Sequence, residues 1–312
     1  KQCHAGIDDK IRKYELEGHM VPDHDMIKNP EQIEGIRRSG VINTAVLDYV
    51  AEHIQVGMST EEIDRMVYEK TLEYNGIPAP LNFEGYPKSV CTSINEEVCH
   101  GIPSKDIILK DGDIVNVDVS TIYKDYFSDS SRMFCLGKVS PEKQKLVDDT
   151  KKAIELGLSY VKPWHRIGEM GNAIYEFARE HGYSVVREVG GHGVGIEFHE
   201  EPFVSYTTKR GEEMLMVPGM IFTIEPMVNM GGCDIYVDEK NGWTIYTEDG
   251  KQNWMSLTAT TDSDGTNPYL KTLFNAINKK DNDQDITLNN HGDLIQWILK
   301  NLNPPPPISG TD

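Results

Sequence analysis

The spacing of apolar and polar residues predicts a chain in which pairs of helices alternate with blocks of short strands. A capping-box pattern, Ser59 followed by Glu62, precedes an apolar run of helical period, so we expect a helix over about 60–74. Pro30 favours the start of another helix, which we expect to run to about His53. Further helices are predicted at about 141–160 and 166–181, and strands at 89–94, 114–120, 126–135 and in short pieces from 184 to 254. This order is typical of an α+β fold, whose two blocks could be related halves.

Two aspartates lie inside one predicted β-hairpin, although strands usually avoid this residue type. A turn at 123–125, centred between its first two residues, would place Asp118 directly opposite Asp129. Like charges whose Cβ atoms are roughly 4.5–5.5 Å apart repel each other, so something positive is expected between them. A divalent metal ion is one answer, and the alternatives are a basic partner such as Arg132 or a different register.

A glycine-rich stretch and a later apolar strand supply further candidate ligands. His192 and His199 are seven residues apart, which puts them on opposite faces of a regular strand, so we expect a loop or bulged turn that brings both to one cavity. Glu225 lies among apolar residues, where a carboxylate is costly unless it is paired or bound to metal. Asp118, Asp129, Glu225 and one of the two histidines form a hard-ligand set with one nitrogen donor, suited to Mn, Fe, Co or Zn and to hydrolysis by an activated water.

The charge balance argues against two classes of partner, nucleic acids and anionic membranes. The chain has 31 Lys and Arg against 50 Asp and Glu, a formal net charge of −19, whereas nucleic acids and anionic membranes reward basic surface. An apolar run long enough for a membrane span is absent from the sequence, as is the apolar core of a signal peptide. The five cysteines show no disulfide-like clustering. We therefore expect a cytoplasmic protein, whose N-terminus, beginning with Lys1, is incomplete.

Four stretches together resemble, in order and spacing, the type I methionine aminopeptidases of the pita-bread fold. They are YPKSVCTSINEEVCHGIPS, DGDIVNVDVSTIYKDYFSDSSRMF, GGHGVGIEFHEEP and IFTIEPMV, and the likeness covers about residues 27–250. The resemblance implies two pseudo-symmetric halves with antiparallel sheet and outer helices. It also implies an exopeptidase with two divalent metal ions (Co, Mn, Fe or Zn) that removes the initiator methionine from new polypeptides. A peptide with N-terminal Met is then the implied substrate, the ribosome a candidate partner and a monomer the expected state.

The resemblance also implies a role for each site residue. Asp118 matches the bidentate ligand of one metal, Asp129 the carboxylate that bridges both, and His192 and Glu225 the ligands of the other, with Glu225 doubling as general base. His100 matches the histidine that contacts the scissile amide nitrogen, and His199 the one that meets the carbonyl oxygen. The implied pocket for the methionine side chain is Phe83, Tyr86, Cys91, Phe198 and Trp243, with His100 beside it.

Two departures from the family pattern stand at the two ends of this region. The family's fifth ligand is a bridging Glu directly after an aromatic residue, but here Met255 follows Trp254, so we expect the second metal site to be weakened. Alternatively, a nearby carboxylate compensates, or unrelated sequence begins at about 252. Cys3 and His4 resemble the last two ligands of a zinc motif that needs four, so we expect no zinc there.

These observations predict an N-terminal extension at 1–26, a metallo-aminopeptidase domain at 27–260 and an appendage of unknown role, partly flexible, at 261–312. One alternative function is a catalytically impaired pita-bread domain that binds peptides or proteins. Another is a proline-cleaving relative of the same fold, against which Phe83, Tyr86 and the spacing of VCHGIP count.

Overall fold

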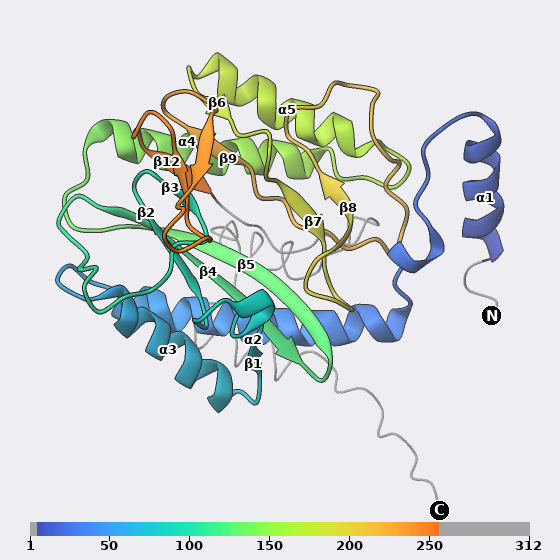
Figure 1. The fold of residues 1–312 in the computed structure, drawn as a ribbon. Helices are drawn as coiled ribbons and strands as arrows, with labels where there is room; N and C mark the ends of the chain where they lie inside the picture. The colour runs from blue at the N-terminus through green and yellow to red at the C-terminus, as the bar shows by residue number, and fades with distance from the viewer. Residues whose placement is uncertain (1–4, 256–312) are drawn as a thin grey trace, which may run out of the picture.

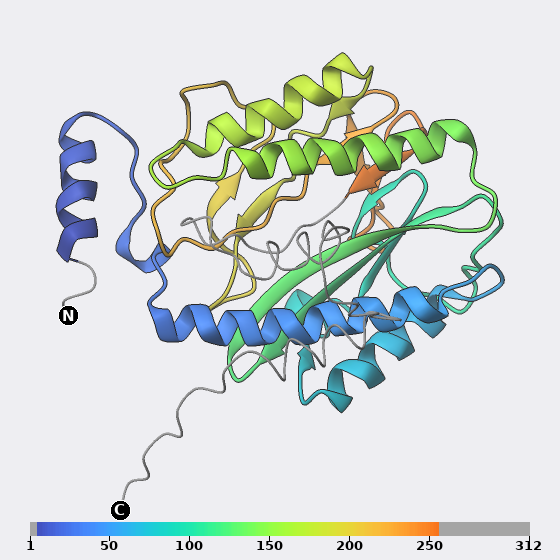
Figure 2. The same ribbon diagram turned by 180° about the vertical axis from the view of Figure 1, so that it is seen from behind.

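A computed structural model describes residues 5–255 of the chain, with helices on two sides of a set of antiparallel strands. Helices α2 and α3 lie along one side and α4 and α5 along the other, with the long β4–β5 hairpin between them (Figures 1 and 2). The helices are α1 (Ala5–Leu16), α2 (Pro30–His53), α3 (Thr60–Glu73), α4 (Pro141–Ser159) and α5 (Ile167–Glu180), with single 3₁₀ turns η1 (His24–Met26) and η2 (Phe83–Gly85). The α+β prediction is confirmed.

The strands fall into four small antiparallel groups. They are β1 (Ile77–Pro78), β2 (Cys91–Ile94), β3 (Glu97–Cys99), β4 (Ile114–Tyr123), β5 (Tyr126–Cys135), β6 (Ser184–Val185), β7 (Gly191–Gly193), β8 (Glu200–Val204), β9 (Met227–Asn229), β10 (Ile235–Val237), β11 (Ile245–Thr247) and β12 (Asn253–Met255). The groups run β1-β4-β2 with β5 beside β4, then β10-β11-β3, β12-β9-β6 and β7-β8. Because β3 pairs with β11, the two blocks of strands predicted from the sequence share a sheet.

The helix starts follow from local chemistry, as the sequence predicts. The Ser59 side chain accepts a hydrogen bond from the Glu62 amide, and the Glu62 carboxylate accepts one from the Ser59 amide. Asn29 and Gln32 form the same reciprocal cap in front of Pro30. These caps satisfy amides that have no partner within the helix, which explains why the boundaries of α2 and α3 could be read from sequence.

The β4–β5 hairpin differs from its predicted register by two residues. Asp118 pairs with Ser131 and Asp129 with Ser120, so the predicted opposition of the two aspartates is wrong. The turn centres between Lys124 and Asp125, which both adopt positive φ (50° and 66°), the conformation of a tight two-residue hairpin turn. A shift of two residues keeps both aspartates on the same face of the sheet, because side chains alternate with period two.

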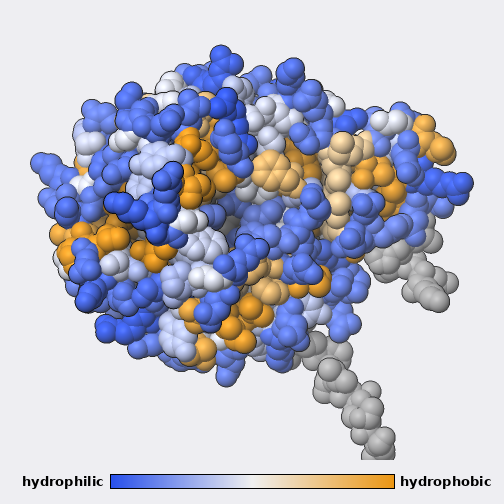
Figure 3. Space-filling model, in the orientation of Figure 1, coloured by the Kyte–Doolittle hydropathy of each residue, from blue (hydrophilic) through white to orange (hydrophobic). Residues whose placement is uncertain are grey.

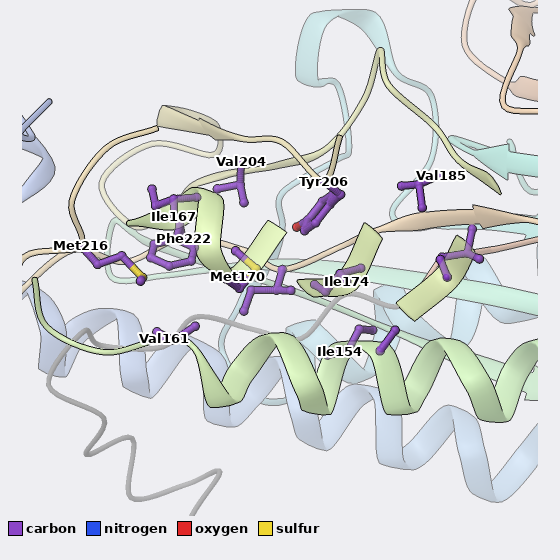
Figure 4. Close-up of a cluster of buried hydrophobic side chains, with 14 of the residues drawn as sticks. Ile154, Val161, Ile167, Met170, Ile174, Val185, Val204, Tyr206, Met216 and Phe222 are labelled. Carbon is purple, nitrogen blue, oxygen red and sulfur yellow. The ribbon is translucent and has the colours of Figure 1, made fainter. Parts of the chain in front are cut away.

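Two apolar clusters hold the layers together. The larger packs α4 and α5 against the second block of strands, and Figure 4 shows Ile154, Met170 and Ile174 from the helices reaching towards Val204 and Tyr206. The smaller packs α2 and α3 against β4, through Val46, Val50, Ile63 and Val117 among others. The candidate ligands therefore project from strands that are supported by helices on both sides.

The N-terminal helix α1 stands beside the main body in Figure 1 but packs on it through a few side chains. Ile11 is 7% exposed and belongs to the larger apolar cluster. The Tyr14 ring stacks on Trp164 at a centroid distance of 5.4 Å, and the Lys10 ammonium lies 4.3 Å from the Trp164 ring. Cys3 and His4, the predicted remnant of a zinc motif, lie outside the described residues, as does the predicted appendage at 261–312.

Among residues 5–255, no helix is both long enough and apolar enough to cross a membrane.

Close approach of α5 to the segment before Tyr206 gives a stability prediction. A Cβ added at Gly171 would lie 2.2 Å from the Ser205 carbonyl oxygen, which is backbone and cannot move aside easily. We expect Gly171→Ala to lower the free energy of unfolding by about 1–3 kcal/mol, measured by chemical denaturation, despite the better helix propensity of Ala. Gly40→Ala in α2 is the control, because nothing lies within 4 Å of its added Cβ. Equal stability of the two variants would contradict the close packing.

Candidate metal centre

Three side chains from separate segments converge on one point. Asp129 comes from β5, His192 from β7 and Glu225 from the segment just before β9. Each offers a ligand atom within 4.8 Å of the others. His192 Nε2 is 3.4 Å from Asp129 Oδ2 and 3.3 Å from Glu225 Oε1. Asp129 and Glu225 are 5% and 7% exposed, so two carboxylates are gathered in a recess with little access to water.

Asp118 joins this group as a third carboxylate. Burial, together with the charges of Asp129 and Glu225, raises the pKa of Asp118 well above its ordinary value. Its Oδ1 atom is buried and has no hydrogen-bond partner in the described part of the chain. Burial also raises the pKa of Glu225, with the Asp129 charge adding to it and His192 opposing it, to about 7. A buried acceptor without a donor among repelling carboxylates is costly, and a cation would offset that cost.

The ring of His192 is oriented towards these carboxylates by its own backbone. Nδ1 lies 2.8 Å from the Gly193 carbonyl oxygen, which requires that Nδ1 carry the proton and donate it there. Nε2 is thereby left to face Asp129 and Glu225. Burial alone would lower the pKa of His192, but the hydrogen bond to Asp129 and the charge of Glu225 outweigh it and raise the pKa to about 9. With this pKa, Nε2 carries a proton that it donates to Asp129, and a divalent cation bound among these carboxylates would displace that proton and take the lone pair of the nitrogen.

Three hydroxyl groups that the sequence analysis missed hold the ligand-bearing segments in place. Thr223 Oγ1 accepts a hydrogen bond from the His192 amide (2.9 Å) and donates one to Glu225 Oε1 (2.6 Å). The Tyr206 hydroxyl accepts a hydrogen bond from the Glu225 amide (2.6 Å) and another from the Gly191 amide. On the other side of the site, Ser120 Oγ donates to Asp129 Oδ1 (2.8 Å). A polar residue inside an apolar strand, such as Thr223, was the one available sequence signal.

The other two histidines lie at the edge of the carboxylate group. The rings of His192 and His199 are 4.5 Å apart, and the β7–β8 pair has a register shift after His192, so the predicted bulged turn that brings both to one place is confirmed. The Trp243 ring is 6.4 Å from His100, whose φ is 57°. Burial lowers the pKa of both His100 and His199, with the charge of nearby His192 adding to the effect, to about 4 for His199, although part of its surface is exposed. Both rings are therefore neutral at neutral pH.

Aromatic side chains line the approach to the histidines. The Phe83 ring is 5.0 Å from Phe198 and 5.2 Å from His199, and Phe127, which the sequence analysis did not single out, stacks on Phe198 at 6.1 Å. Tyr86 packs edge-on against Trp243 at 5.2 Å. Figure 3 shows that the face of the molecule seen in Figure 1 is hollowed near its middle, with hydrophobic and hydrophilic surface around the depression.

Cys91 connects this aromatic lining with the carboxylates. It is 8% exposed and pairs in register with Asp118 across the β2–β4 ladder. All six residues predicted to bind the substrate side chain therefore lie around the histidines and carboxylates, in contact with one another or with a member of that group.

The position of the missing fifth ligand is defined by the backbone. In the β12–β9 pair, Met255 stands opposite Met227, two residues after Glu225. Strand β12 thus runs beside β9, the strand that follows Glu225, and has no carboxylate at position 255. Strand β12 continues the fold to Met255, so its backbone path up to that residue is part of the domain.

Comparison with known proteins assigns these features to a family. The sequence model of metallopeptidase family M24 matches residues 34–251. This chain belongs to metallopeptidase family M24. The methionine aminopeptidase of Escherichia coli (strain K12) is 45% identical over 224 residues, which cover 72% of this chain and 84% of that protein. The methionine aminopeptidase of Rickettsia prowazekii (strain Madrid E) is 40% identical over 214 residues, covering 69% and 82%. A crystal structure of methionine aminopeptidase from Rickettsia prowazekii superposes with a TM-score of 0.74 at 34% identity, covering 78% of this chain and all of that one.

Membership of the family confirms the resemblance seen in the sequence, the pita-bread fold and a metal-dependent exopeptidase. The donor set agrees with it, since the buried carboxylates of Asp129 and Glu225 and the imidazole of His192, with the carboxylate of Asp118 nearby, suit a divalent transition metal. Nothing in these comparisons favours the alternative of a peptide-binding module without catalysis.

The hydroxyl of Thr223 gives a test of the donor set. Thr223→Val keeps the side-chain shape but leaves the His192 amide without its acceptor and removes a donor from Glu225. We expect affinity for Mn²⁺ or Co²⁺, measured by calorimetric titration, to fall about 10–100-fold. Thr150→Val is the control, because the Thr150 hydroxyl is buried without a hydrogen-bond partner in the described residues. Unchanged affinity in Thr223→Val would show that this hydroxyl does not support the ligands.

Proposed function

We propose that this chain removes the N-terminal methionine from polypeptides by metal-assisted hydrolysis. The observation that carries the proposal is the convergence of Asp129, His192 and Glu225, with Asp118 beside them, next to a wall of aromatic side chains. The activity is named for the relatives that match most of this chain. The ligand set, the roles of the histidines and the composition of the pocket are parts of the proposal.

In this proposal Asp118, Asp129, His192 and Glu225 would hold divalent metal, with Asp129 as a shared ligand and Glu225 also serving as general base. Bound metal supplies acidity to a water molecule and a positive charge for the oxygens of the tetrahedral intermediate. Glu225 is placed to take a proton from a water molecule at this centre, because its Oε1 atom lies in the ligand group, 3.3 Å from His192 Nε2. The Thr223 hydroxyl fixes which Glu225 oxygen faces the site, since it donates to Oε1.

The two neutral histidines contact different atoms of the scissile peptide bond. His199, 4.5 Å from the His192 ring, is placed to donate a hydrogen bond to the carbonyl oxygen as negative charge develops there. His100, near Trp243, is placed to contact the amide nitrogen. A neutral imidazole can donate from one nitrogen, which a low pKa does not prevent.

The aromatic wall selects the residue that is removed. Phe83, Phe198, Tyr86 and Trp243 offer ring faces and edges, with Cys91 at the base of the wall. An unbranched thioether side chain fills such an irregular apolar space and makes favourable sulfur–aromatic contacts. Methionine therefore fits this wall better than a charged or β-branched residue.

The further aspects of the proposal concern metal stoichiometry and context. With no carboxylate at Met255, the ion shared by Asp118 and Asp129 is held more weakly than the ion at His192 and Glu225. We further propose a monomer that acts in the cytoplasm on new chains, with the ribosome as a candidate partner. The division into residues 1–26, 27–260 and 261–312 remains a prediction.

Replacement of His199 tests its role at the carbonyl oxygen. We expect His199→Ala to lower turnover of a Met-initiated peptide by roughly 10²–10³, the usual loss for one such donor, with metal content unchanged. His181→Ala, at the exposed end of α5, is the control and should keep its turnover. Loss of metal from His199→Ala would instead make His199 a ligand and overturn its proposed role.

The metal stoichiometry tests the proposal at Met255. Titration with Mn²⁺ or Co²⁺, checked by elemental analysis, should show one tight ion and a second bound much more weakly, with slow release of N-terminal Met. Met255→Glu should restore the second ion and speed hydrolysis, whereas Met255→Gln, of the same length but neutral, should not. Two tight ions and rapid hydrolysis in the unmodified chain would show that another carboxylate takes this place.

A further inference from the structure

The loop of residues 194–199, which joins β7 to β8, carries two of the side chains proposed to contact substrate. Phe198 and His199 stack on each other at a centroid distance of 4.3 Å. The His199 ring also lies 4.5 Å from His192 and 5.2 Å from Phe83, but no hydrogen bond reaches its nitrogens from residues 5–255. The orientation of His199 therefore depends on the backbone of this loop.

Glu200, the first residue of β8, folds its carboxylate back under the loop. Its Oε1 atom accepts hydrogen bonds from the amides of Ile196 (2.5 Å) and Glu197 (2.8 Å). Its side chain is 13% exposed, so these bonds form away from bulk water. Two amides that donate to one carboxylate oxygen fix the turn just before Phe198 and His199. Each hydrogen bond restricts the rotation of the backbone at its amide.

Lys28 supplies the opposite charge from a distant part of the chain. Its ammonium donates to the Glu200 Oε2 atom and to the Asp25 carbonyl oxygen (3.1 Å), and its side chain is only 2% exposed. The Lys28 amide donates to the Gly219 carbonyl oxygen (2.8 Å), which fixes its backbone to the body of the domain. The charge is thus presented from a rigid position, and neither member can lose its partner without leaving a buried charge unpaired.

The Lys28 side chain also packs directly against the backbone of the loop. A Cβ at Gly195 would lie 3.7 Å from Lys28 Cε and 2.3 Å from Ile36 Cδ1, so the loop backbone packs on these side chains. The Gly195 carbonyl oxygen accepts a hydrogen bond from the Phe127 amide (2.8 Å). The loop is therefore held at its start by packing and at its end by the carboxylate of Glu200.

We propose that Lys28 and Glu200 form a positioning pair that sets the 194–199 loop, and through it the imidazole of His199, for peptide hydrolysis. The pair acts through the loop backbone and does not touch substrate. The proposal rests on the proposed function for its kinetic consequence and on the loop geometry alone for its structural one. It ties the segment at residues 25–28, where the N-terminal extension ends, to the active site.

The test compares Lys28→Met, Glu200→Gln and the double variant in the full chain with metal added. Hydrogen exchange should be faster for the amides of 194–199 in each single variant, by on the order of tenfold or more, because their closed state is less stable. For a Met-initiated peptide, kcat should fall on the order of tenfold with a smaller change in KM and unchanged metal content. The double variant should lose less than the sum of the two, since both changes remove the same interaction.

Asp149→Asn is the matched control, since Asp149 is a buried carboxylate on α4 that pairs with Lys145 and Lys152 far from the loop in sequence. It should lower the free energy of unfolding without changing loop exchange or kcat. Normal loop exchange and kcat in folded Lys28→Met and Glu200→Gln would overturn the proposal, as would changes no larger than those of Asp149→Asn.

Two further measurements decide the proposal if the first variants or the unmodified chain do not behave as expected. If the single variants do not fold, Glu200→Asp keeps the charge but withdraws it by one methylene, and unchanged exchange at Ile196 and Glu197 would then overturn the proposal. If the unmodified chain fails to release methionine, the proposed function fails, while loop exchange in the variants still decides whether the pair sets the loop.

Discussion

The mutual repulsion of three carboxylates in a recess is the constraint on which the rest of the site depends. Burial, with the charges of Asp129 and Glu225, raises the pKa of Asp118, and burial, with the charge of Asp129, raises the pKa of Glu225. Such a group is stable only if bound protons or a bound cation neutralise it. It also needs a frame, here the surrounding fold, that is strong enough to hold the carboxylates together. The two helical layers and their apolar clusters supply that frame.

The frame reaches the ligands through hydroxyl groups rather than through apolar packing alone. Thr223, Tyr206 and Ser120 each connect a ligand or its backbone to a neighbouring segment. Hydroxyls suit this task because they can accept a hydrogen bond from an amide and donate one to a carboxylate at the same time. A carboxylate that already accepts a fixed donor keeps its other lone pairs aimed at the metal, which links the packing of β7 and β9 to the chemistry of the site.

Much of the fold could be predicted from the sequence, because helix caps and apolar period are local signals. Ser59 with Glu62, and Pro30 at the beginning of α2, mark the helix starts that the structure has. The hairpin register could not be predicted, since it depends on Lys124 and Asp125 both adopting positive φ, which Lys rarely does. The candidate site was predicted mainly through a family resemblance. Contacts such as Tyr206 with Glu225, or Lys28 with Glu200 across 172 residues, leave no local pattern in a single sequence.

The predicted register of the β4–β5 hairpin is wrong by two residues, yet both aspartates still face the same side of the sheet. The physical reason also explains how the site tolerates change. Sheet geometry conserves face under shifts of two residues, so Asp118 and Asp129 reach one recess whether they are opposed or diagonal. The diagonal arrangement is the better one for two carboxylates, because it lengthens their separation and gives Asp129 a hydroxyl neighbour, Ser120, in place of a like charge. The position of Met255 differs from those of the two aspartates, because it does not depend on the hairpin register. Strand β12 fixes where its backbone lies, and its residues Asn253, Trp254 and Met255 include no carboxylate. The candidate ligands Asp118, Asp129 and His192 are therefore placed by the β4–β5 hairpin and β7, whereas the proposed weakening of the second metal site rests on the residue at position 255 of the last described strand.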